Sequence, residues 1–218
     1  AGHYSHDEVH IDLRTLAAFA GARFFKDEVI GLDRASGKMT ELYTACDGHK
    51  LSAPNDLVFD KTGGFYFTDL GKGFSRNRDH GGVYYASPDG SSIKEVIYPL
   101  ESPNGIGISP EGDSVYVAET HTGRVLSWPI EGPGIVGRPN PIGHGGIVLA
   151  GLAGHQLLDS LAIDSAGNVV VATIINGGLT VVSPDGASIE HVALPDLLVT
   201  NVCFGGEDLR TAYVTCSG

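Results

Sequence analysis

Four polar residues occupy the same place in four similar stretches of the sequence. They are Asn55, Asn104, Asp159 and Asn201, and consecutive members lie 49, 55 and 42 residues apart. Amide and carboxylate oxygens are hard donors, which suit Ca²⁺ better than Zn²⁺ or copper. A single Asn often does no more than satisfy a turn. Its recurrence in register favours a shared oxygen-lined cation site, provided that the fold brings the residues together.

The stretches that contain these residues share one template. Each has a polar residue, alternating apolar positions, a turn with Gly or Asp, and a second apolar run, and they cover residues 54–69, 103–119, 158–173 and 200–215. This pattern predicts a β-hairpin, repeated four times. Third and fourth strands are predicted after the first three hairpins, in residues 81–98, 123–134 and 177–194.

The spacing of the repeat predicts the architecture. Periods of about 40 to 55 residues with four strands in each unit are typical of β-propeller blades. We therefore expect an all-β propeller in a single domain over residues 1–218. Four to five blades are expected, as in a fragment of a larger closed ring, with residues 1–27 unassigned. The predicted blades are 28–50 (partial), 54–98, 103–149, 158–194 and 200–218 (partial).

In a propeller the first strand of each blade lies against the central channel, so equivalent positions converge there. Asn55, Asn104 and Asp159 are therefore predicted to line one metal site. The prolines that precede the two asparagines have a fixed φ and should aim these side chains. His121 follows a predicted inner strand and is expected to face the channel.

The four stretches "PNDLVFDKTGGFYFTD", "SPNGIGISPEGDSVYVAET", "DSLAIDSAGNVVVAT" and "FGGEDLRTAYVT" carry a resemblance. They resemble the gluconolactonase and senescence marker protein (regucalcin) family of six-bladed propellers, which is similar to diisopropyl fluorophosphatase. The resemblance implies a divalent metal at the channel mouth. Calcium is the usual ion, with Mg²⁺, Mn²⁺ or Zn²⁺ as alternatives.

The resemblance also implies roles for individual residues. Asn104 and Asp159 fall on the metal-ligand Asn and Asp of the family, and Asn55 falls on a further Asn that binds substrate or metal. Asp56, next to Asn55, is expected to orient the ligands from behind. From their places in the repeat, His121 and Asn201 are expected to contact substrate.

Two features depart from the family pattern. The ligand Glu of the family belongs to a blade that would lie upstream of Ala1. Sugar lactonases of the family also carry an Arg two residues before the first Asn, where this chain has Ala53. This second difference argues against an aldonolactone as the substrate.

The function that these features imply is calcium-dependent hydrolysis of a lactone, with Asp159 as general base or nucleophile. Two alternatives remain open at this point. One is an organophosphate hydrolase of the diisopropyl fluorophosphatase type, and the other is a non-catalytic propeller that binds calcium or another ligand.

Composition excludes several other classes. A formal net charge of −12 would repel a nucleic acid. No apolar run approaches the roughly 18 residues that span a bilayer, so no membrane partner is expected. Three cysteines without a C-x-x-C pair indicate a reducing compartment, such as the cytoplasm. Cys203 and Cys216 lie in apolar strand patterns and are predicted to be buried.

Overall fold

The computed structural model describes residues 32–33, 38–39 and 41–218. The chain divides into two compact units, residues 1–44 and residues 45–218. In the first unit, β1 (Leu32–Asp33) pairs antiparallel with β2 (Lys38–Met39). The rest of the predicted partial blade up to residue 40, and all of residues 1–27, lie outside the described residues.

The second unit opens with a short hairpin of β3 (Ala45–Cys46) and β4 (His49–Lys50). The antiparallel sheets that follow are built from strands in chain order. The first contains β5 (Pro54–Phe59), β6 (Phe65–Asp69), β7 (Gly81–Ala86) and β8 (Ile93–Leu100). The second contains β9 (Pro103–Ile108), β10 (Ser114–Glu119), β11 (Arg124–Gly132), β12 (Ile135–Val136) and β13 (Ile147–Gly151). The third contains β14 (Leu157–Ile163), β15 (Val169–Ile174), β16 (Gly178–Val182) and β17 (Ile189–Ala193). The last pairs β18 (Val199–Gly205) with β19 (Thr211–Cys216).

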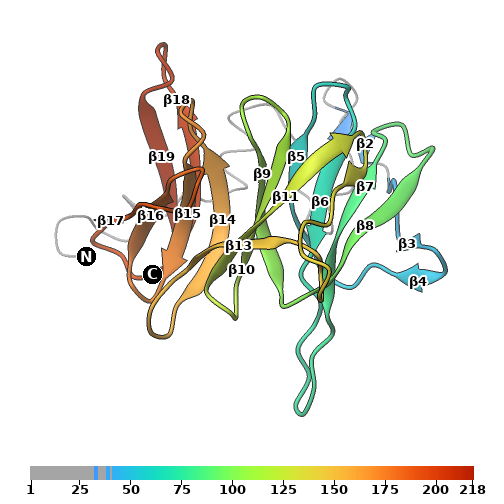
Figure 1. Ribbon diagram of the computed structural model, residues 1–218, viewed down its shortest axis with the longest axis horizontal. Helices are drawn as coiled ribbons and strands as arrows, with labels where there is room; N and C mark the ends of the chain where they lie inside the picture. The colour runs from blue at the N-terminus through green and yellow to red at the C-terminus, as the bar shows by residue number, and fades with distance from the viewer. Residues whose placement is uncertain (1–31, 34–37, 40) are drawn as a thin grey trace. The chain divides into compact units, whose positions relative to one another are not determined.

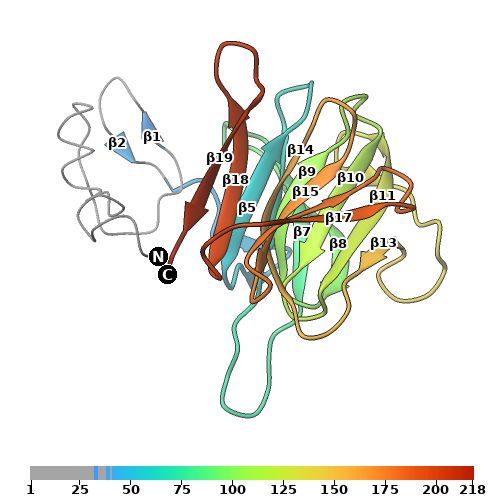
Figure 2. The same ribbon diagram turned by 90° about the vertical axis from the view of Figure 1, so that its left-hand side faces the viewer.

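These sheets are the blades of a propeller. Figure 1 shows them side by side in chain order, from β5–β8 to β18–β19. The first strand of each blade contacts the first strand of the next, in the order β5, β9, β14 and β18. In Figure 2 these innermost strands lie together on one side, with β8 and β13 on the other. The predicted all-β propeller and its four repeated hairpins are confirmed. The described part of the chain has no helix long and apolar enough to cross a membrane.

Alternation along the second strands of the second and third blades builds much of the core. On β10, Val115 and Val117 face a cluster shared with the first blade, while Tyr116 and Ala118 face a cluster shared with the third blade. The third blade repeats this pattern, because alternate residues of β15 contact the second blade and the β18–β19 pair. Since side chains alternate with a period of two, one strand can supply two different interfaces.

A β-bulge marks the beginning of the innermost strand in three blades. Between matched pairs of the ladder, two residues of this strand stand opposite one residue of its neighbour. The pairs of extra residues are Asn55–Asp56, Asn104–Gly105 and Asp159–Ser160. In the fourth blade the ladder also shifts, but there Thr200 is the unpaired residue and Asn201 pairs with Thr215. A bulge redirects side chains locally, so all three predicted metal ligands lie where the strand re-aims them.

Two sequence-based expectations were wrong. The fourth strand of the second blade is β13, which lies outside the predicted 123–134 segment and pairs with β11. Cys203 and Cys216 are exposed rather than buried, whereas Cys46 is buried. Both exposed cysteines belong to the β18–β19 pair, most of whose residues are open to solvent.

Candidate functional site

Asn104 provides a buried oxygen without a partner. Its side chain is 6% exposed, and its Nδ2 donates a hydrogen bond to Thr120 Oγ1 at 3.1 Å. Its Oδ1 is buried and accepts no hydrogen bond in the described structure. Burying a carbonyl oxygen without a donor costs about 1–3 kcal/mol. A cation is the kind of partner that would remove this cost.

Asp159 lies beside the Asn104 side chain. Burial raises the pKa of its carboxyl, and the negative charge of Asp56 raises it further. Hydrogen bonding to the Asn104 side chain and the Ser160 backbone acts in the opposite direction. A half-buried carboxylate of this kind binds a proton or a cation more readily than an exposed one.

Asp56 connects three blades. Its Oδ2 accepts hydrogen bonds from Ser160 Oγ at 2.6 Å and from the Ile106 backbone N–H at 3.4 Å. Its own backbone N–H donates to Thr68 Oγ1 at 3.1 Å. Asp56 thus ties the bulge of β5 to β9 and β14, and it lies close enough to Asp159 to influence the pKa of that carboxyl.

The other predicted site residues are more exposed. Asn55 is exposed, and no hydrogen bond of its side chain is found among the described residues. Asn201 is also exposed, and its Oδ1 accepts a hydrogen bond from the Val202 N–H at 2.7 Å. The structure thus joins Asp159 to the Asn104 side chain by a hydrogen bond and places Asp56 near Asp159, while the roles of Asn55 and Asn201 stay predictions.

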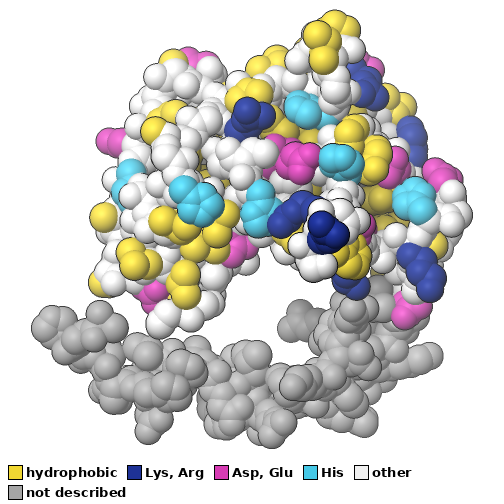
Figure 3. Space-filling model, turned by 90° about the horizontal axis from the view of Figure 1, so that it is seen from below, with side chains coloured by type: hydrophobic (Ala, Val, Ile, Leu, Met, Phe, Trp, Pro, Cys, Tyr) yellow, Lys and Arg dark blue, Asp and Glu magenta, His cyan; other side chains and the backbone are white. Residues whose placement is uncertain are grey.

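His121 belongs to a group of titratable side chains at the same end of the blades. Partial burial lowers its pKa, as do the nearby Arg78 and His155, while Glu101 opposes this effect. His80 Nδ1 lies 3.1 Å from Glu101 Oε1. The loop between β6 and β7 extends below the sheets in Figure 1, and Figure 3 shows histidine and basic side chains gathered on the face seen from below.

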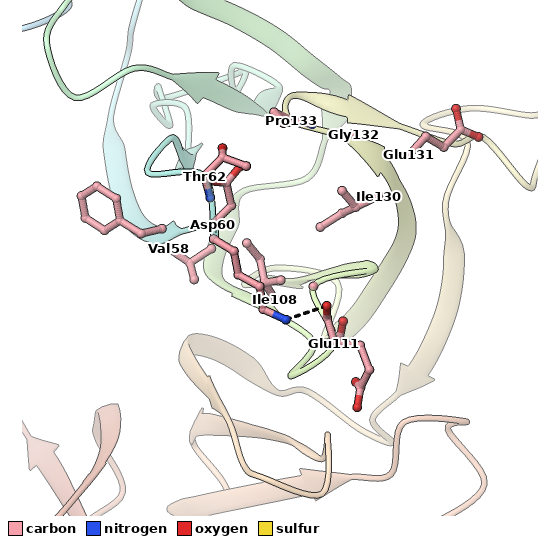
Figure 4. Close-up of a pocket in the computed structure, with 13 residues that line it drawn as sticks. Val58, Asp60, Thr62, Ile108, Glu111, Ile130, Glu131, Gly132 and Pro133 are labelled. Carbon is pink, nitrogen blue, oxygen red and sulfur yellow. Dashed lines mark hydrogen bonds between the residues drawn. The ribbon is translucent and has the colours of Figure 1, made fainter.

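A pocket at the opposite end of the blades is separate from this site. It has a volume of about 380 Å³ and lies among the β5–β6 turn, the β9–β10 turn and the end of β11. Val58, Ile108 and Ile130 project towards it (Figure 4). Because Asn55 and Asn104 stand at the other ends of β5 and β9, this pocket does not include the candidate site.

Several residues around the site were not predicted from the sequence. Thr120 holds the Asn104 amide, and Ser160 holds Asp56. Asp69 and Glu119 end the second strands of their blades and bind the backbone ahead of β5 and β9. The sequence does contain a signal for the two acids, because the second strands of the first two blades end in "YFTD" and "YVAE", with an acidic residue at the last position of each.

The donors at the site are of the type that calcium prefers. They are an amide oxygen and a carboxylate, with a second carboxylate behind them. No group of three or more His, Cys, Asp or Glu side chains suited to a metal occurs among the described residues. Any cation here would therefore depend on the amide oxygens as well as on Asp159.

Comparison with known proteins agrees with the fold and the motifs. The chain is 36% identical over 141 residues to lactonase drp35 of Staphylococcus haemolyticus, an alignment that covers 65% of this chain and 42% of that protein. Lactonase drp35 of Staphylococcus saprophyticus is 37% identical over the same length. The chain thus spans less than half of the curated relatives that it matches.

Solved structures show the same similarity. A gluconolactonase from Xanthomonas campestris superposes with a TM-score of 0.68 at 25% identity, covering 85% of this chain and 61% of that one. Regucalcin from Agrobacterium tumefaciens, described as a calcium-binding protein, gives a TM-score of 0.65 at 22% identity, covering 84% and 60%. At this identity, the regucalcin match supports the fold alone.

A family model also matches most of the chain. The region that it describes, SMP-30/gluconolactonase/LRE-like, covers residues 20–218. Because this match covers most of the chain, and the repeated bulges and their polar residues agree with it, the chain belongs to the SMP-30/gluconolactonase/LRE-like family.

Proposed function

We propose that the protein is a hydrolase that opens a lactone at the end of the blades where β5, β9 and β14 begin. The observation that carries the proposal is the Asn104 side chain, which has a buried, unpartnered Oδ1 and is hydrogen-bonded to the desolvated carboxylate of Asp159. The similarity to lactonase drp35 and to a gluconolactonase supports a cyclic ester as the substrate class.

Asp159 is the proposed general base. Its raised pKa makes the ionised carboxylate a stronger proton acceptor than an exposed aspartate. It takes a proton from water as the water oxygen bonds to the lactone carbonyl carbon. The ring C–O bond then breaks, and the released alkoxide takes a proton to give the open hydroxy acid. Ser160 and the Ile106 N–H hold Asp56 in place beside this reaction.

A divalent cation fits the donors at this site. Asn104 Oδ1, Asp159 and Asn55 would hold it, with calcium preferred over Mg²⁺, Mn²⁺ or Zn²⁺ because the donors are hard oxygens. When bound, such an ion polarises a carbonyl oxygen and stabilises the negative charge that develops on it. His121 and Asn201 are proposed to contact the substrate from the neighbouring loop and blade.

Replacing the proposed base tests this function. In the full-length protein with calcium, Asp159→Asn should lower kcat for lactone hydrolysis by at least about 100-fold, because an amide cannot accept the proton. The matched control is Asp164→Asn in the turn at the far end of β14, where the Asp164 carboxylate accepts hydrogen bonds from Ala166 and Asn168 of the same turn. This control should retain wild-type turnover.

Two results would overturn the proposal. One is unchanged lactone turnover in Asp159→Asn, and the other is preferential turnover of a fluorophosphate by the wild type. Calcium titration monitored by thermal unfolding tests the cation separately, since a ligand that binds only the native state raises Tm as its concentration increases. Absence of this rise at millimolar calcium would remove the cation from the mechanism.

A further inference from the structure

Two buried acids occupy equivalent places in the first and second blades. Asp69 is the last residue of β6 and is 4% exposed, and Glu119 is the last residue of β10 and is 3% exposed. Their Cα partners on the innermost strands are Pro54 and Pro103. Each acid therefore faces the proline that directly precedes a bulge.

Both acids bind the backbone just ahead of that proline. Asp69 accepts hydrogen bonds from the N–H groups of Ser52 at 2.6 Å and Ala53 at 2.5 Å. Glu119 accepts one from the N–H of Glu101 at 2.7 Å, and its other oxygen accepts one from Thr122 Oγ1 at 2.7 Å. The two carboxylates thus fix the approach of the chain to β5 and to β9.

The proline explains why a side chain, and not the backbone ladder, holds the segment ahead of each bulge. A proline has no N–H to donate to the ladder, so the strand pair loses a hydrogen bond at that position. The residues after the acids restore part of the pairing, because Leu70 donates to Ala53 O and Thr120 donates to Ser102 O, each at 2.9 Å. The carboxylates hold the segment ahead of the proline, which the ladder no longer reaches.

The other two blades provide an internal comparison. At the same place the third blade pairs Leu158 with Thr173, and the fourth pairs Val199 with Cys216. Neither blade has the proline, and neither has the acid. In the four blades that the structure describes, therefore, the buried carboxylate at this place occurs only where a proline opens the innermost strand.

The second blade links its acid to the candidate site. Thr120 follows Glu119 directly, and its Oγ1 accepts the hydrogen bond from Asn104 Nδ2. This contact determines which end of the Asn104 amide is left over, and the atom left over is the buried Oδ1. A shift of Glu119 would move Thr120 and with it the Asn104 amide.

We infer that Asp69 and Glu119 are positioning residues for Asn55 and Asn104. Neither acid forms an ion pair among the described residues, whose ion pairs involve His49 and His80. Burying a carboxylate without a cation is costly unless hydrogen bonds satisfy it. Here the N–H groups ahead of the bulges donate hydrogen bonds to the carboxylates. These hydrogen bonds offset the cost of burying the two acids, and they also hold the segments ahead of the bulges in place.

The experiment compares Glu119→Gln and Asp69→Asn with Asp60→Asn in the full-length protein. Asp60 is a matched control because it also accepts backbone N–H bonds, from Thr62 and Gly64, but at the far end of the β5–β6 hairpin. All three variants are expected to lower Tm. Only the first two should lower kcat for lactone hydrolysis, by about 10- to 100-fold, as is typical when the support behind a metal ligand is removed.

A second readout does not depend on turnover. In ¹⁵N-labelled protein, Glu119→Gln should move the side-chain amide resonances of Asn104, and Thr120→Val should move them similarly, whereas Asp60→Asn should leave them in place. Hydrogen exchange at Ser52 and Ala53 should accelerate in Asp69→Asn. Unchanged Asn104 resonances in Glu119→Gln, or a loss of kcat in Asp60→Asn as large as in the other two, would overturn the inference.

The kinetic part of this inference rests on the proposed function, and the two can fail separately. A wild-type protein that turns over no lactone refutes the proposed function. The resonances of Asn104 and the exchange rates then still decide whether the two carboxylates position the bulges.

Discussion

At the scale of single residues, the properties that suit Asp159 to catalysis oppose its stability. Burial and the charge of Asp56 raise the pKa of its carboxyl, so the folded state disfavours the ionised form. A group whose pKa is higher in the folded state stabilises the protein fully below its unfolded pKa, and this contribution is lost as the pH rises through the folded pKa. At neutral pH the ionised carboxylate is therefore a net cost.

Asp159→Asn should accordingly raise Tm at pH 7 in the presence of a chelator, because the amide has no charge to desolvate. The gain over wild type should shrink as the pH falls through the raised pKa of Asp159 towards 3.8, since the wild-type carboxyl becomes protonated. Thermal unfolding between pH 3 and pH 8 measures this difference. A gain that is independent of pH would contradict the assigned cause.

An exposed aspartate with the opposite pKa shift is the control. The Ser183 hydroxyl and the Ala187 N–H lower the pKa of Asp185, which lies in a surface turn. Such a group stabilises the protein above its unfolded pKa, and that contribution is lost as the pH falls through the folded pKa. Asp185→Asn should therefore lower Tm slightly at pH 7, and the loss should vanish in acid.

At the scale of elements, the site depends on how closely β9 approaches β14. A Cβ placed on Gly105 would lie 2.6 Å from Leu161 N and 2.7 Å from Asp159 O. These neighbours are backbone atoms, which cannot rotate away as a flexible side chain can. Gly105 is therefore required for the contact that brings Asn104 and Asp159 together.

Gly105→Ala should destabilise the protein by about 1–3 kcal/mol, the usual cost of overpacking. It should also lower lactone turnover, because β14 must move away from β9. Gly151→Ala is the matched control, since a Cβ at Gly151 meets nothing within 4 Å. Urea unfolding measures both variants. Equal stability of the two would show that β9 and β14 can separate without cost.

The sequence predicted the hairpins because their apolar positions alternate around turns with a glycine. It missed β13, because Ile147–Gly151 lies in a Gly-rich stretch and most of its side chains are exposed, so burial leaves no alternating pattern there. The convergence of Asn104 and Asp159 followed from the repeat alone. The hydrogen bonds of Asp69 and Glu119 could not be predicted in this way, because they join a side chain to backbone that is distant in the sequence, and no periodic pattern indicates such contacts.

At the scale of the whole molecule, each blade is stabilised through its neighbours. The apolar clusters lie between blades, so the same strand supplies one face to the preceding blade and the other to the next. Repeat proteins built this way gain stability from nearest-neighbour interfaces. The candidate site shares this dependence, because its residues come from three blades.

Val171→Ala tests whether the blades unfold together. Val171 is fully buried between the second and third blades, and its truncation should cost about 2 kcal/mol. The single Trp128 lies in the cluster between the first and second blades. If unfolding is cooperative, its fluorescence transition and the circular dichroism transition should both shift to lower urea by the same amount. A shift in circular dichroism alone would show that the blades unfold separately.

The bulges at the beginnings of β5, β9 and β14 also bear on how such a protein could acquire a new activity. Each bulge presents two residues opposite a single one, so its side chains are not part of the regular alternation that builds the interfaces. A substitution of the first residue of a bulge, which is Asn55, Asn104 or Asp159, can change a donor while leaving the packed hairpin behind it intact. The chain thus has three positions, far apart in the gene and at the same end of neighbouring blades, at which single codon changes can alter specificity.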